Sequence, residues 1–158
     1  MAEDKPTNEK HFSIQKIHVK DVSLEAPNSP TIFTETWDDP KVEINLSSNA
    51  QSLQKDLFEV SLTVTVTVKI KKKTAYLVEV CQAGIFSVSG LTEAEMGPML
   101  GSFCPNLLFP YAREVVSDLV TKGGFPPMHL APVNFDALYA QHIERMQEQN
   151  PPATHTIN

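Results

Sequence analysis

The fold of this chain is decided by the stretch Phe58-Glu59-Val60-Ser61-Leu62-Thr63-Val64-Thr65-Val66-Thr67-Val68-Lys69-Ile70. Every even-numbered residue in it is apolar and every odd-numbered residue is polar, which is the period of a β-strand with one face buried and the other in water. β-Branched residues hold many of the positions, and they favour pleated backbone. We therefore expect a long strand here, and the rest of the chain has to supply its partners and the layer over its apolar face.

A second strand with the same alternation follows a short basic turn, and its apolar positions are Tyr76, Val78, Val80, Phe86 and Val88. The segment Lys71-Lys72-Lys73 separates the two strands. A loop with an odd number of residues pairs even positions with even positions, so both apolar sets lie on one face of the hairpin. This register predicts Thr65 near Glu79 and Thr67 near Leu77 on the polar face.

Two further strands are expected before the hairpin. Apolar residues between 12 and 24 alternate with two three-residue steps, which indicates β-bulges in a long bent strand. Val42, Ile44 and Leu46 indicate a shorter strand. The residues between these strands, 26–37, contain two prolines and the aromatic residues Phe33 and Trp37, which is typical of a long crossover loop without regular pairing.

The final third of the chain changes to helical spacing. Thr92 and Glu95 form a capping box, so a helix is expected to begin near Glu93. Pro105 and Pro110 are expected to interrupt or kink it before it ends at the glycines after residue 122. Its apolar stripe is wide, which indicates a second contact, most simply another copy of the chain. A second helix is predicted to begin with Asn134 as its cap.

Bulk properties exclude several classes of protein. The length of 158 residues fits one domain, expected at 12–147, with disordered tails at 1–11 and 148–158. A net charge of −6 disfavours nucleic acid as a partner. Neither a secretory signal nor a membrane-spanning stretch is present, so no direct membrane insertion is expected. Two cysteines without Cys-x-x-Cys spacing suit the reducing cytoplasm.

No pattern of residues points to catalysis, a cofactor or a metal. The glycines lack the spacing of phosphate-binding loops, Ser87 lies in strand-like sequence instead of a nucleophile elbow, and the histidines lack metal-ligand spacing. A non-enzymatic protein-binding subunit is therefore expected. The alternative from another class is a hotdog-type small-ligand enzyme, which would need Glu114 or Asp118 on the long helix as its catalytic carboxylate.

Four segments together resemble the SecB family of bacterial export chaperones; they are Lys20-Asp21-Val22-Ser23-Leu24-Glu25-Ala26-Pro27-Asn28, Gly84-Ile85-Phe86-Ser87-Val88-Ser89-Gly90, Cys104-Pro105-Asn106-Leu107-Leu108-Phe109-Pro110-Tyr111-Ala112-Arg113-Glu114 and Leu130-Ala131-Pro132-Val133-Asn134-Phe135-Asp136-Ala137-Leu138-Tyr139. The resemblance implies an α+β subunit with a four-stranded antiparallel sheet and C-terminal helices on one side. It also implies a homotetramer, a dimer of dimers, that needs neither ATP nor a cofactor. Such a chaperone binds unfolded precursor proteins, keeps them competent for export and delivers them to the motor SecA.

The resemblance also implies two sets of site residues. The zinc-containing, basic C-terminal segment of SecA would bind Asp21, Glu25, Leu77 and Glu79. Client grooves would be lined by Phe33, Trp37, Val42, Ile44, Leu46, Phe135, Leu138 and Tyr139. Two features depart from the family pattern, because the turn at 69–73 is basic and the tail after Asn150 lacks carboxylates. A related alternative is a SecB-like adaptor chaperone for a dedicated client such as an antitoxin.

Overall fold

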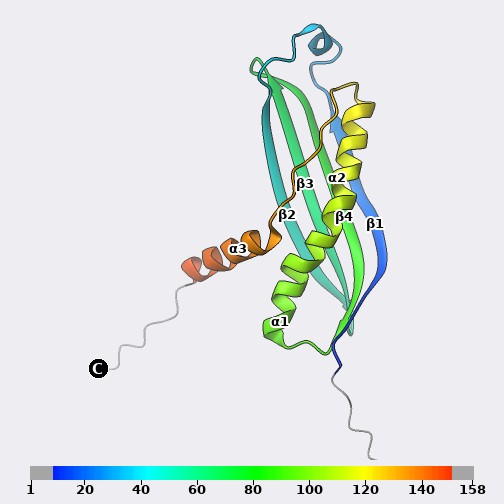
Figure 1. The fold of residues 1–158 in the computed structure, drawn as a ribbon, viewed down its shortest axis with the longest axis vertical. Helices are drawn as coiled ribbons and strands as arrows, with labels where there is room; N and C mark the ends of the chain where they lie inside the picture. The colour runs from blue at the N-terminus through cyan, green and yellow to red at the C-terminus, as the bar shows by residue number, and fades with distance from the viewer. Residues whose placement is uncertain (1–8, 151–158) are drawn as a thin grey trace, which may run out of the picture.

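A computed structural model describes residues 9–150, which form one antiparallel sheet with helices on one of its faces (Figure 1). The sheet has the order β1-β4-β3-β2. Its strands are β1 (His11–Glu25), β2 (Lys41–Gln54), β3 (Leu57–Ile70) and β4 (Lys73–Ser89). The helices are α1 (Glu93–Pro98), a π-helical segment (Met99–Phe103), α2 (Cys104–Lys122) and α3 (Phe135–Gln149), with a 3-10 turn at Thr31–Thr34 in the crossover loop. The predicted α+β class is confirmed.

The β3–β4 hairpin has the register that its sequence predicts, with Thr65 opposite Glu79 and Thr67 opposite Leu77. The turn is shorter than predicted. It contains two residues, Lys71 and Lys72, which adopt the left-handed φ angles of 49° and 67°. One extra residue on β4, beside Val68, then restores the pairing of even with even positions. A two-residue turn and a bulge therefore replace the expected three-residue loop.

The two edge strands compare differently with their predictions. Strand β1 has its register shifts after Ile14 and after Val19, where the three-residue steps predict bulges. Strand β2 was predicted to be short, and this is wrong, because it pairs with β3 over 14 residues from Lys41 to Gln54. Its second half is mostly polar on both faces, with Ala50 and Leu53 as the apolar exceptions. Backbone hydrogen bonds to the well-formed β3 hold it there, and these bonds do not depend on side-chain pattern.

The core lies between the apolar face of β3 and β4 and the inner side of α2. Helix α2 lies lengthwise on the sheet, as Figure 1 shows, and its inner side is fully buried at Leu108, Ala112, Val116 and Val120. Beneath it the valines of the decisive stretch have no exposed surface. These two strands and this helix make the rigid body on which the remaining surfaces are displayed.

The first helix is not broken at Pro105 or Pro110, and a kink, the other expectation at these prolines, stays a prediction. The Thr92 cap is confirmed, since Thr92 Oγ1 accepts a hydrogen bond from the Glu95 amide. The backbone then stays helical through Pro105 and Pro110 as far as Lys122. The π-helical segment directly precedes Cys104-Pro105. Its wider turn changes the spacing to the preceding carbonyls, which is where a proline ring collides with a regular α-helix.

Helix α3 leaves the body of the molecule after its first turn (Figure 1). Its predicted cap is confirmed, because the Ala137 amide donates to Asn134 Oδ1 over 3.0 Å. Strand β1 begins at His11 and α3 ends at Gln149, each slightly outside the predicted domain limits of 12 and 147. The predicted tails otherwise fall largely outside the described residues, at 1–8 and 151–158. Within residues 9–150, none of the helices has the length and apolar content to cross a membrane.

Candidate functional site

The inner face of β2 carries an uncovered apolar row. Register places Val42, Ile44 and Leu46 opposite Val68, Val66 and Val64, so their side chains point to the same side of the sheet as the core. Helix α2 covers β3 and β4 but does not reach β2 (Figure 1). Val42 and Ile44 are consequently 45% and 47% exposed, while Leu46 is half-buried. Three of the predicted groove residues therefore form one row.

One end of this row opens into a cavity of about 580 Å³ between β2, the π-helical segment and α3. Its apolar lining includes four predicted groove residues, Leu46, Phe135, Leu138 and Tyr139. Phe135 is only 6% exposed and packs edge-on against Phe109, with ring centroids 5.7 Å apart. Leu138, in contrast, is 41% exposed. The four residues are brought together, and Phe135 serves the core as much as the cavity.

Two glycines allow α3 to pack closely on the first helical segments. The sequence analysis did not single them out for this site. A Cβ atom on Gly101 would lie 2.6 Å from the ring of Tyr139, and one on Gly97 would collide with its hydroxyl. Ser102, nearly fully buried, also donates a hydrogen bond to Asp136 in the first turn of α3. The signal was the spacing of four between the glycines, which puts both on one side of a helix.

The other end of the row lies beside an aromatic cluster at the crossover loop. Phe33 and Trp37 both pack on Phe125, with centroid distances of 5.2 and 6.1 Å. Phe125 in turn contacts Tyr76 at 4.7 Å, and burial raises the pKa of Tyr76 to about 12. Phe33 keeps half of its surface exposed. The sequence analysis missed Phe125 as the anchor, since it lies in a proline-rich link without periodicity.

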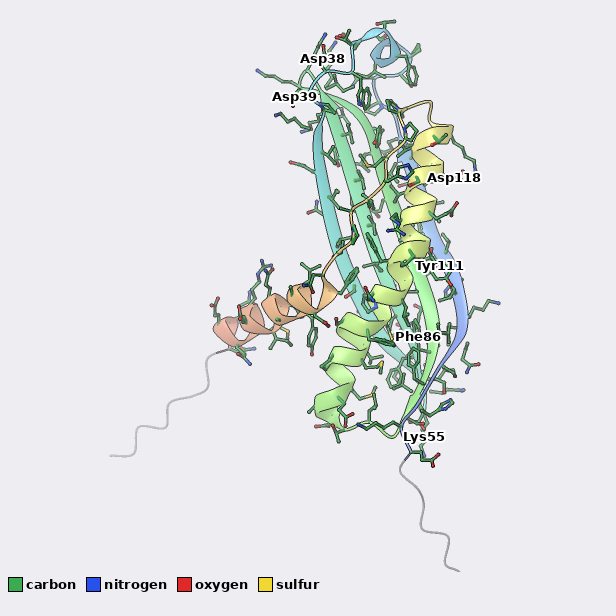
Figure 2. The ribbon with its side chains drawn as sticks, in the orientation of Figure 1. Asp38, Asp39, Lys55, Phe86, Tyr111 and Asp118 are labelled. Carbon is green, nitrogen blue, oxygen red and sulfur yellow. The ribbon has the colours of Figure 1, made fainter. Side chains whose placement is uncertain are left out.

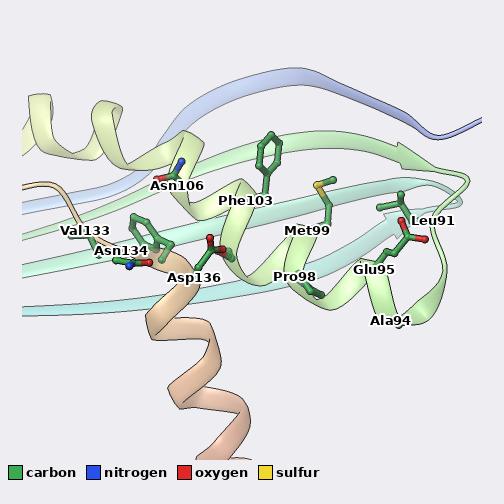
Figure 3. Close-up of a pocket in the computed structure, with 12 residues that line it drawn as sticks. Leu91, Ala94, Glu95, Pro98, Met99, Phe103, Asn106, Val133, Asn134 and Asp136 are labelled. Atoms are coloured by element: carbon green, nitrogen blue, oxygen red, sulfur yellow. The ribbon is translucent and has the colours of Figure 1, made fainter.

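A second cavity, of about 550 Å³, lies on the other side of the α3 attachment (Figure 3). Met99 and Phe103 lie on one side and Asp136 on the other, with Glu95 near the far end. Both carboxylates already have partners, because Glu95 pairs with Lys10 at 2.7 Å and Asp136 accepts from Ser102. The Lys10 hydrogen bond lowers the pKa of Glu95. This cavity extends the apolar surface around α3 and was not predicted.

The outer face of the sheet brings the four predicted SecA-facing residues together. Glu25 pairs with Leu77, and Glu79 lies one row further between Ser23 and Thr65, whose hydroxyl donates to Glu79 over 3.2 Å. Asp21 lies in the next row, opposite Cys81. Among the ion pairs of residues 9–150, none involves Asp21, Glu25 or Glu79. Their charge is therefore not neutralised within this part of the chain.

Glu43 adds a further carboxylate to this outer face, opposite Thr67 in the row of Leu77. The sequence analysis missed it because β2 was expected to be a minor strand. Further along the same face, Glu59 is compensated by Lys20 at 2.7 Å and by His18 at 3.5 Å. The free negative charge is thus confined to the part of the face that surrounds Leu77.

A family model described as SecB, preprotein translocase subunit SecB, matches residues 5–146. The chain belongs to the SecB family. A relative from Methylococcus capsulatus named protein-export protein SecB is 66% identical over 154 residues, 98% of this chain and 99% of that protein. Another of the same name, from Nitrosococcus oceani, is 57% identical over 137 residues, 86% of this chain and 84% of that protein. The chain is accordingly a chaperone for preprotein export.

A solved structure confirms the fold of this chain. It is a Mycobacterium tuberculosis SecB-like chaperone in complex with a ChAD peptide from the HigA1 antitoxin. Its TM-score is 0.65 at 17% sequence identity, and the match covers 77% of this chain and 90% of that one.

The enzyme alternative is wrong for this chain, since the family consists of non-enzymatic chaperones. The two carboxylates that the enzyme alternative required, Glu114 and Asp118, line neither of the two cavities around α3. Glu114 is exposed, and Asp118 forms an exposed ion pair with Lys122 at 2.7 Å, one helical turn away. Both are best explained as solvated residues on the outward side of α2.

Proposed function

We propose that this chain binds extended segments of unfolded precursor proteins along β2, without nucleotide, between the aromatic cluster and the cavity of about 580 Å³. The observation that carries this proposal is the uncovered row Val42, Ile44 and Leu46, which connects the two apolar ends. Strands rise about 3.4 Å per residue, so the row accommodates about four residues of an extended client and its two ends accommodate more. Apolar burial contributes about 25 cal/mol per Å² without regard to direction, which suits clients of varied sequence.

We further propose that the basic, zinc-containing C-terminal segment of SecA docks on the outer face, at Asp21, Glu25, Leu77 and Glu79. The uncompensated carboxylates would attract a basic segment and orient it, and their effect would weaken as salt screens it. Leu77 would supply the apolar anchor between them. The clients and the motor would then occupy opposite faces of one sheet, so that a chaperone can hold both at once.

We infer that the working assembly is a homotetramer, a dimer of dimers, in the cytoplasm. Two uncovered apolar surfaces support further contacts between copies. One is the inner side of β1, where Ile14, Val19 and Val22 are 42–47% exposed. The other is the outward side of the long helix, where Phe103 and Tyr111 are 45% and 50% exposed. Light scattering of the full chain tests the tetramer, and a monomer mass would contradict it.

The client site is tested by calorimetry with a chemically unfolded precursor protein and the variant Ile44→Asp. A carboxylate in the row would have to lose its water when a client binds, so we expect the Kd to rise by at least about tenfold. Asn45→Asp is the matched control, because it adds the same charge to the next residue on the opposite face. An unchanged Kd for Ile44→Asp, or an equal rise for both variants, would place the clients elsewhere.

The motor site is tested with a synthetic SecA C-terminal segment loaded with zinc. Glu79→Gln and Asp21→Asn should each weaken its binding by about threefold to tenfold at low salt and leave precursor binding unchanged. Glu144→Gln, on the exposed part of α3, is the control. If the unaltered chain holds precursors but does not bind the segment, the alternative of an adaptor chaperone with a dedicated client replaces this proposal.

A further inference from the structure

The crossover loop is tied to the β3–β4 turn by one carboxylate with two cationic partners. Glu35 Oε2 lies 3.1 Å from Lys71 Nζ, and Glu35 Oε1 lies 3.6 Å from Lys73 Nζ. The side chain of Glu35 is 25% exposed, whereas those of the two lysines are about half exposed. The hydrogen bond and the charge of Lys71, with the charge of Lys73, lower the pKa of Glu35.

The position of this carboxylate relates it directly to the aromatic end of the proposed groove. Glu35 lies midway in sequence between Phe33 and Trp37, the two residues that pack on Phe125. The loop has a second link to the hairpin, since Asn28 Nδ2 donates to the Thr74 carbonyl over 2.9 Å. The ion pairs therefore fix the backbone between two ring contacts, at the place where a small displacement would move both rings.

The geometry of the turn explains how the lysines reach the loop. Lys71 and Lys72 both adopt left-handed backbone, which asparagine and glycine adopt more readily than lysine. Backbone preference therefore does not explain why lysine occupies this turn. Contact with Glu35 supplies a reason for a lysine at 71 and for another at 73, where the strand resumes.

We propose that Glu35 is a positioning residue, and that its ion pairs to Lys71 and Lys73 set how Phe33 and Trp37 are presented to a client. The proposal rests on the client site proposed above and deepens it. It also assigns a role to the basic turn, one of the two features in which this chain departs from the family pattern. Lys71 and Lys73 then help to position the groove residues of the crossover loop, and this role explains the basic turn without any effect on the acidic outer face.

The chain contains a single tryptophan, Trp37, so its fluorescence reports on this loop alone. We expect Glu35→Lys to repel Lys71 and Lys73, to shift the emission of Trp37 to longer wavelength, and to raise the Kd for an unfolded precursor. An ion pair at a partly exposed site supports an effect of about threefold to fivefold. High salt should shift the emission of the unaltered protein in the same direction and leave that of Glu35→Lys almost unchanged.

Charge reversal distinguishes positioning from a general loss of structure. The combined variant Glu35→Lys, Lys71→Glu, Lys73→Glu restores opposite charges, so both the emission and the Kd should return toward those of the unaltered protein. Glu148→Lys is the matched control, because it makes the same substitution at an exposed residue near the end of α3, outside the crossover loop.

The outcomes separate this proposal from the client site itself. Unchanged emission in Glu35→Lys, or failure of the combined variant to restore it, would overturn the positioning role. A restored shift in emission without any change in the Kd would show that the loop moves but that clients do not sense it, which also overturns the proposal. Loss of binding in Ile44→Asp together with an unaltered Kd in Glu35→Lys would retain the client site and remove only the role of Glu35.

Discussion

Helices α2 and α3 carry similar apolar stripes, but α2 is buried against the sheet and α3 is largely exposed. Helix α2 lies on the sheet and buries residues along its whole length, among them Leu108, Val116 and Val120. Helix α3 buries only Phe135, and its later apolar residues Leu138 and Met146 are 41% and 51% exposed. The polar and apolar periodicity that predicts a helix therefore does not predict what the helix packs against.

The outward side of α2 shows that even the buried helix is only partly satisfied. Figure 2 draws Tyr111 and Asp118 along it, one aromatic and one charged, and both are exposed. A helix of this length within a protein gains most of its stability from packing. The comparison indicates that packing along the whole sheet holds α2 in place, whereas contacts of the first turn alone hold α3 in place.

The largest expected effect is the loss of a side chain beneath α2. Leu108→Ala should lower the free energy of unfolding by about 2–5 kcal/mol, because it leaves a cavity in a fully buried layer. Leu138→Ala makes the same chemical change on α3, where we expect a change of no more than about 0.5 kcal/mol. Urea denaturation of both variants provides the measurement. Equal losses would mean that α3 is part of the cooperative core.

An intermediate effect is expected at the joint that holds α3. Gly101→Ala places a methyl group against the Tyr139 ring, so the first turn of α3 should pack less well on the π-helical segment. We expect the free energy of this local packing to become less favourable by about 1–3 kcal/mol. Hydrogen exchange should accelerate in α3 and not in α2. Adding Tyr139→Ala to Gly101→Ala removes the collision, and the double variant should then differ little from Tyr139→Ala alone. Slow exchange throughout α3 in Gly101→Ala would contradict this account.

The smallest expected effect concerns the Cys104 thiol at the start of α2, which we expect not to be alkylated in the native protein. Burial raises the pKa of the Cys104 thiol to about 12, so it should resist alkylation at pH 8 in the native protein and react after unfolding in urea. Mass spectrometry of the digested protein gives the modified residue. Modification of Cys104 before unfolding would show that the first turn of α2 opens as readily as α3.

The same shift has a consequence for stability at alkaline pH. The folded protein keeps this thiol protonated, whereas the unfolded chain releases the proton above its ordinary pKa of about 8.5. The corresponding stabilisation is therefore complete below that pH and is lost as the pH rises toward 12. Buried Tyr76 acts in the same direction, starting from its ordinary pKa of about 10.

Much of the sheet was predictable because alternation and parity are local properties. The two bulges of β1 follow from residue spacing. The register of Thr65 with Glu79 agrees with the alternation of both strands, although a bulge on β4 produces it and not the odd-length loop that was expected. The full length of β2 does not, since the strand is held by the backbone of β3 and its own side chains contribute little pattern. The continuity of the helix through Pro105 was also missed, because a wider helical turn has no composition of its own.

The candidate site was predictable in its members more than in its arrangement. The resemblance supplied Val42, Ile44 and Leu46, and the structure places them in one exposed row. Their partner Phe125 was missed because it lies in a link that has no periodicity. The pairing of Glu35 with Lys71 joins residues 36 positions apart, and the spacing of charges along a chain carries no information at that range.

The order of strands in the sheet also governs the order in which the chain can fold. Strands β2, β3 and β4 follow one another and pair through short connections, so they can form as soon as they have been synthesised. Strand β1 is made first and pairs with β4, from Glu25 with Leu77 to His11 with Ser89. Closing that contact spans more than about 50 residues and has the larger entropic cost. Pairing of β1 can therefore begin only after Leu77 has been synthesised, and it is complete only after Ser89 has been synthesised.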